Sequence, residues 1–94
     1  MEFEPLPGGD LVRRGLADLA AGRESAESLL VEIGRPRLER LGFAFATARA
    51  AGGELPEHRL YRRLAASDPR RAHSRYNALV RRLASFERAL RIRR

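Results

Sequence analysis

Apolar residues recur with a helical period over the last quarter of the chain. Between Asp68 and Arg94 the steps between successive apolar positions are four, three, four, three and four residues, which keeps them on one side of an α-helix. We call these positions the apolar seam; they are Ala72, Tyr76, Leu79, Leu83, Phe86 and Leu90. The pattern predicts one long helix, capped by Ser67 or Asp68 and carrying Pro69 in its first turn.

A shorter amphipathic segment near the start of the chain predicts a first helix over residues 11–21. Asp10 is the residue type that caps helix N-termini, and apolar residues follow it at helical spacing. Gly15 lies inside this helix, where the missing side chain would permit a close helix crossing. Residues 1–9 contain two prolines and two glycines without any period, so we expect a flexible N-terminal arm unless Phe3 and Leu6 pack in a groove.

The next apolar period, over residues 25–41, is interrupted by the triplet Gly34-Arg35-Pro36. Ser25 is a favourable N-cap for the first part, and proline within the period ends or kinks a helix. We favour two short helices over one kinked helix. A DNA-binding helix-turn-helix is disfavoured, because Arg40 would occupy a position that is apolar in that motif. A structural helical hairpin fits better.

A further helix is predicted over residues 56–66. Pro56 suits its first position, and Leu60, Tyr61 and Leu64 would form its buried edge. The segment between the helical periods, residues 42–54, alternates aromatic residues and then becomes rich in alanine and glycine. It predicts a loop or a single helical turn.

Together these elements predict an all-α fold. We expect the arm at 1–9 and a single helical domain at 10–94, built as a bundle of four to five helices whose longest is C-terminal. With 94 residues the chain can bury one modest core. The residues expected in that core are Val12, Leu16, Leu19, Leu29, Leu30, Ile33, Leu38, Leu41, Leu60, Leu64, Leu79, Leu83, Phe86 and Leu90.

Charge is distributed unevenly along the chain, whose formal net charge is +7. Residues 1–54 carry seven arginines and nine acidic residues, whereas residues 55–94 carry twelve arginines and three acidic residues. All nineteen basic residues are arginine, a bias that a GC-rich genome also produces. Arginine nevertheless stays charged and makes forked contacts to phosphate and carboxylate. Either the two halves of the chain pack on each other, or the second half faces an anion.

The arginines of the last two predicted helices form a candidate polyanion-binding surface near the turn between them. Its members are Arg59, Arg62, Arg63, Arg70, Arg71 and Arg75. On a helical wheel the arginines of the last helix form two rows. One row flanks the seam, and the second, which contains Arg81 and Arg88, lies further round. Tyr61 and Tyr76 are assigned to the core, so this surface lacks aromatic side chains for stacking on bases. A solvated face with no partner is the alternative.

Few residues are available for catalysis or for binding a metal or cofactor. Without cysteine there can be no disulfide or thiolate ligand, and a metal site would need both His58 and His73 with carboxylates. The cluster of residues 73–77 holds groups able to act as acid or base, but helical spacing separates them. We therefore expect no enzyme, no cofactor and no metal.

The N-terminus is acidic and broken by proline and glycine, unlike a secretion signal, and no apolar run is long enough to cross a membrane. We expect a cytoplasmic protein without a membrane partner.

Two functions remain. The first is a non-enzymatic interaction module that self-associates as a dimer, or binds a small partner protein, through the last helix. Six seam positions exceed what the short upstream helices need to cover. The interface would consist of Tyr76, Leu79, Leu83, Phe86 and Leu90. The alternative is binding of nucleic acid, or another polyanion, through the arginines of the last two helices.

Overall fold

The computed structural model describes residues 3–45 and 53–93, which form five α-helices and no strand. The helices are α1 (Gly9–Ala20), α2 (Ala26–Ile33), α3 (Arg35–Arg40), α4 (Pro56–Ser67) and α5 (Ala72–Arg93). The predicted all-α class is confirmed, as is the long C-terminal helix. In the described ranges, no helix combines the length and apolar character that a membrane span requires.

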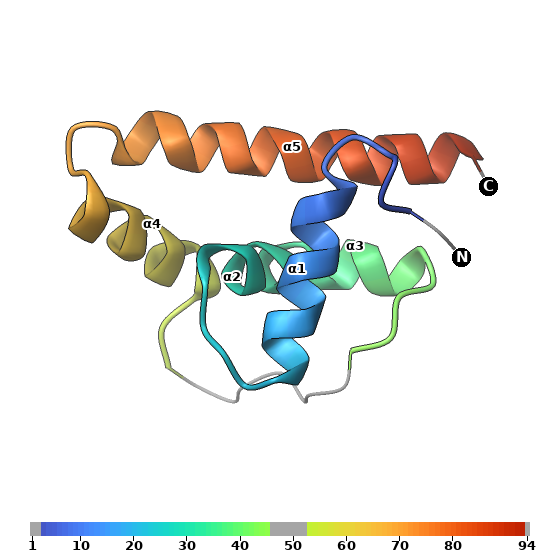
Figure 1. Ribbon diagram of the computed structural model, residues 1–94, viewed down its shortest axis with the longest axis horizontal. Helices are drawn as coiled ribbons and strands as arrows, with labels where there is room; N and C mark the ends of the chain where they lie inside the picture. Colours follow the sequence, from blue (N-terminus) through green and yellow to red (C-terminus); the bar gives the residue numbers. More distant parts are fainter. Residues whose placement is uncertain (1–2, 46–52, 94) are drawn as a thin grey trace.

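Helix α5 lies along one long side of the molecule, and the other four helices lie on the same side of it (Figure 1). α1 packs on α2, α2 packs on α4, and α4 packs on α5. The overall dimensions are 38 × 28 × 19 Å. One side of α5 therefore covers the bundle, and the opposite side has no helix against it.

The core forms where the apolar seam of α5 meets the other helices. Phe86 at its centre is 0% exposed, and Leu83 and Leu90 are 2% and 1% exposed. The ring of Phe86 lies against the rings of Phe3 and Phe43, with centroid distances of 5.6 and 5.9 Å. Every residue predicted for the core is either buried or packed against the buried cluster. Val31 is a buried member that the sequence analysis omitted.

The start of the described chain packs against α5 instead of forming a free arm over residues 3–8. Gly8 has a φ of +74°, and a side chain there would lie 2.6 Å from the carbonyl oxygen of Arg82. Glycine is therefore needed both for the backbone angle and for the close approach to α5. Gly8 also occupies the N-cap of α1, so the predicted cap at Asp10 is wrong. The carboxylate of Asp10 instead accepts a hydrogen bond from Arg82 at 3.2 Å.

Helices α1 and α2 approach closely at Gly15, as the sequence predicted. A Cβ atom at this position would lie 2.4 Å from the carbonyl oxygen of Glu27 and 2.7 Å from Cγ1 of Val31. Any side chain at Gly15 would force the two helices apart.

A hydrogen-bonded cluster fixes the connection from α1 to α2. The hydroxyl of Ser25 donates to the carboxylate of Asp18 at 2.7 Å and accepts from the amide of Ser28 at 3.0 Å. The amide of Ser25 donates to the hydroxyl of Ser28 at 2.8 Å, which completes a capping box and confirms Ser25 as the cap. The hydrogen bond from Ser25 is the main reason that the pKa of Asp18 is lowered, and Arg23 lowers it further.

Only Gly34 separates α2 from α3, so the preference for two helices is correct. Figure 1 shows α3 continuing in the general direction of α2, which means that the predicted hairpin is wrong. A side chain at Gly34 would lie 2.8 Å from Leu83 and 3.0 Å from Glu87, so α5 approaches the bend closely. The buried carboxylate of Glu87 accepts a hydrogen bond from Arg37 at 2.8 Å.

Two further predictions need correction near α4. Residues 68–71 form a turn, so α5 begins at Ala72, later than expected, and Ser67 belongs to α4. Tyr61 is 41% exposed and does not lie on the buried edge with Leu60 and Leu64. Of the predicted loop at 42–54, residues 46–52 lie outside the described ranges, and the described remainder contains no helix.

Replacing Phe86 by alanine tests whether the seam forms this core. Loss of a fully buried ring should lower the free energy of unfolding by about 3–5 kcal/mol. Urea unfolding followed by circular dichroism measures this change. The matched control is Ile92→Ala on the same helix, where the side chain is 78% exposed and the expected change is below about 0.5 kcal/mol. A small effect of Phe86→Ala would place the ring on a surface.

The acid dependence of stability tests the Asp18 cluster. A carboxyl group whose pKa is lowered by folding stabilises the native state above its unfolded pKa of about 3.9, and this contribution disappears as pH falls through the folded pKa. Asp18→Asn should therefore be less stable than the parent chain at pH 6, and the difference should shrink towards pH 3. Ser25→Ala, which removes the main cause, should reduce the same pH dependence. A difference that stays constant with pH would contradict this role.

Candidate functional site

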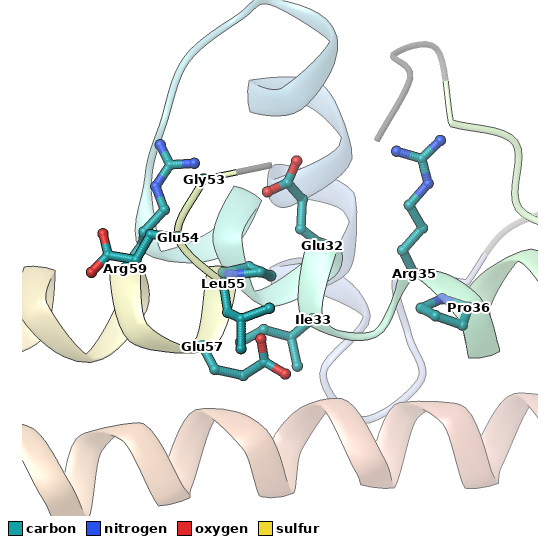
Figure 2. A pocket seen from close by; sticks show the side chains of 10 residues that line it. Glu32, Ile33, Arg35, Pro36, Gly53, Glu54, Leu55, Glu57 and Arg59 are labelled. Atoms are coloured by element: carbon teal, nitrogen blue, oxygen red, sulfur yellow. The ribbon is translucent and has the colours of Figure 1, made fainter. Parts of the chain in front are cut away.

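A cavity of about 480 Å³ lies beside the bend between α2 and α3 and the residues that lead into α4. Figure 2 shows the residues that line it, which include three carboxylates, those of Glu32, Glu54 and Glu57. The two guanidinium groups in its wall have partners in the fold. Arg59 pairs with Glu24, whereas Arg35 pairs with Glu39 at 3.4 Å and lies over the ring of Phe45. Both arginines of the wall are therefore neutralised by carboxylates within the fold, so neither marks this cavity as an anion site.

The two histidines lie on the surface, outside this cavity. His58 is exposed, and the Nε2 atom of His73 lies 3.2 Å from the side-chain amide nitrogen of Asn77. Near them the hydroxyl of Ser74 donates to the carbonyl of Arg71, and Tyr76 packs on Tyr61. Across residues 3–45 and 53–93, no three histidine or acidic side chains are grouped so as to hold a metal ion. The side chains of residues 73–77 therefore make separate contacts with different neighbours.

The seam residues predicted to bind a partner divide into two groups. Leu83, Phe86 and Leu90 are buried inside this chain, so their side chains are not available on its surface. Tyr76 and Leu79 are only partly buried and pack against the edge of the core. The short upstream helices therefore cover most of the seam, and only its N-terminal end keeps an accessible edge.

The six arginines predicted near the turn between α4 and α5 do not form a uniform cationic patch. Arg62 pairs with Glu54, and the guanidinium of Arg71 lies 3.8 Å from Asp68. Arg59 is held by Glu24, as described above. The other three predicted residues, Arg63, Arg70 and Arg75, are exposed and have no ion-pair partner among the described residues. Half of the predicted set is thus neutralised locally.

A larger group of unneutralised arginines extends along α5, with Arg81, Arg88 and Arg91 on the side away from the seam and Arg75 and Arg93 flanking it. We call it the arginine face; it consists of Arg75, Arg81, Arg88, Arg91 and Arg93, all of which are exposed. Within the described part of the chain no carboxylate forms an ion pair with any of them. Arg82, the remaining arginine of α5, pairs with Asp10. From Arg75 to Arg93 the face extends about 27 Å along the helix axis.

Sequence reasoning placed the site at the helix junction and therefore omitted most of this face. The signal was present, since Arg81 and Arg88 are seven residues apart and fall opposite the seam on a helical wheel. What the sequence could not give is which arginines find carboxylates on other helices, because those pairs depend on tertiary packing.

Two tyrosine rings meet at the junction of α4 and α5, where Arg75 directly precedes Tyr76. The ring centroids of Tyr61 and Tyr76 are 5.9 Å apart and their planes are tilted by 55°. Burial raises the pKa of Tyr76, and the nearby carboxylate of Glu57 raises it further, so its hydroxyl stays protonated at neutral pH. Because Tyr61 is 41% exposed, the pair presents aromatic surface that the sequence analysis had assigned to the core.

Comparisons of the chain with protein-family models, with curated proteins and with solved structures found no match.

Proposed function

We propose that this chain is a nucleic-acid-binding module that contacts the phosphate backbone through the arginine face of α5. The single observation that carries the proposal is that five exposed arginines along one helix lack carboxylate partners in the described part of the chain. Charge of one sign along a rigid helix matches the regular negative charge of a phosphate backbone.

The contrast with the other helices supports this choice. The arginines of α1 and α3 mostly lie beside carboxylates, as in the pairs Arg13–Glu4, Arg35–Glu39 and Arg37–Glu87. On α5 the only acidic residue is Glu87, which is buried and already engaged by Arg37. The cationic charge of α5 is thus not neutralised by its own helix.

Arginine is also suited to this ligand chemically. Its planar guanidinium donates paired hydrogen bonds that match the oxygens of a phosphate, and it stays charged at any physiological pH. An acidic protein segment could bind the same guanidinium donors. We choose nucleic acid because the exposed ring of Tyr61, which contacts Tyr76, could also stack on a base.

The salt dependence of binding tests the electrostatic part of the proposal. If each of the five arginines neutralises one phosphate, the affinity for a single strand should fall about 100-fold between 50 and 200 mM salt. Fluorescence anisotropy of a labelled oligonucleotide measures this slope. Polyglutamate serves as competitor, and equal affinity for polyglutamate would indicate an acidic protein partner instead.

The location of the site is tested by reversing charge on one helix at a time. Arg81→Glu combined with Arg88→Glu should weaken binding roughly tenfold or more and make the salt dependence shallower by about 1.4 in slope. The matched control is Arg13→Glu combined with Arg14→Glu on α1, which changes net charge equally and should leave most of the affinity. Equal losses in both double variants would mean that total charge, and not the arginine face, determines binding.

Self-association or binding of a partner protein through α5 is a second candidate. The observation that favours it is the exposure of Ile92, whose side chain is 78% exposed near the C-terminal end of α5. Assembly through Ile92 should give a sedimentation mass that rises with concentration, and Ile92→Glu should abolish the rise. A single monomeric species at high concentration would eliminate self-association and leave nucleic-acid binding as the better-supported proposal.

A further inference from the structure

We infer that the Tyr61–Tyr76 pair is a base-stacking platform, and that the preferred ligand of this chain is a single strand whose bases lie on the tyrosines. The inference rests on the proposed function, because the phosphates of the same strand would be held by the arginine face. Beyond the proposed function, it states that the bases of the nucleic acid are recognised and that the ligand is single-stranded.

The geometry of the pair fits an aromatic platform. The two rings come from different helices, and their tilt of 55° leaves them in contact without covering each other's faces completely. Tyr61 is 41% exposed, and the packing of α4 on α5 fixes the backbone beneath it. Leu64 lies one helical turn after Tyr61 on α4, and Ala72 lies one turn before Tyr76 on α5. These two residues are 2% and 1% exposed. A ring held on such a support loses little conformational entropy when a base stacks on it.

Arg75 is the member of the arginine face that adjoins the platform, because it directly precedes Tyr76. Arg81 lies five residues after Tyr76, about 7.5 Å along the helix axis and about 140° around it, so it projects from the other side of α5. A strand with one base on the tyrosines would therefore meet Arg75 first and pass around α5 to reach Arg81.

Arginines without an ion-pair partner among the described residues lie on both helices that carry the platform. Arg75 directly precedes Tyr76 on α5, and Arg63 follows Tyr61 by two residues on α4; both are exposed. A phosphate backbone that leaves the platform therefore meets cationic side chains on either helix.

A single strand fits this arrangement better than a duplex. Bases in a duplex are stacked on each other, so their faces are not available to a tyrosine ring. In a single strand every base has a free face, and stacking on aromatic side chains is tolerant of sequence. A surface that combines arginines with exposed aromatic rings is typical of proteins that bind single strands.

The experiment compares an oligonucleotide of about ten nucleotides with an abasic strand of equal length and with a duplex of the same sequence. The abasic strand keeps the phosphates and removes the bases. We expect the base-bearing strand to bind about 5-fold to 100-fold more tightly than the abasic strand. We also expect it to bind more tightly than the duplex. The chain has two tyrosines and no tryptophan, so quenching of its intrinsic fluorescence reports stacking on this pair directly.

Tyr61→Leu should lower the affinity for the base-bearing strand to that for the abasic strand, and Tyr61→Phe, which keeps the ring, should retain most of the difference. Ile92→Ala is the matched control for a general loss of exposed apolar surface, and circular dichroism verifies that each variant is folded. Equal binding of base-bearing and abasic strands, with no effect of Tyr61→Leu, would overturn this inference while leaving phosphate binding intact. Absence of binding to every strand at low salt would overturn the proposed function as well.

Discussion

The packing of the apolar seam of α5 against the other helices determines which surface of this protein is available to a partner. Leu83, Phe86 and Leu90 are almost fully buried, and each contributes about 1.5–3 kcal/mol by leaving water. Because the seam is confined to one side of α5, its burial turns the remaining side to solvent. That side holds arginines with no carboxylate partner in the described part of the chain. The orientation of the cationic surface is thus a consequence of the core.

Close approaches of the backbone make this packing possible. Gly15 lets α1 contact α2, and Gly8 and Gly34 bring the N-terminal segment and the bend between α2 and α3 against α5. Four short helices can therefore cover most of the seam of a 22-residue helix, and a second copy of the chain is not needed for that purpose. Carboxylates of α1, of α3 and of the segments that connect the first four helices meanwhile engage nearby arginines, which leaves unneutralised charge on the outer side of α5.

Sequence periodicity was sufficient for the class of fold, the long last helix and the membership of the core, because hydrophobic spacing alone decides which residues face inward. It was less reliable where tertiary packing competes with local preference. Asp10 is a better cap than Gly8 by residue type, yet the approach of Arg82 requires glycine at the turn. Tyr61 has the spacing of a core residue but lies at the edge against Tyr76. The site was harder still, since pairing of an arginine depends on acidic residues distant in sequence.

Mapping of contacts by nuclear magnetic resonance tests most directly whether the solvent side of α5 is the binding surface. A short single-stranded oligonucleotide is titrated into the isotope-labelled chain, and shifts are followed for backbone amides and for the Nε–Hε groups of arginine. We expect the largest changes at Arg81, Arg88 and the exposed turns of α5, with the tyrosine pair next and little change in α1 and α3. Changes centred on α1 to α3, or no changes at low salt, would contradict nucleic-acid binding by this face.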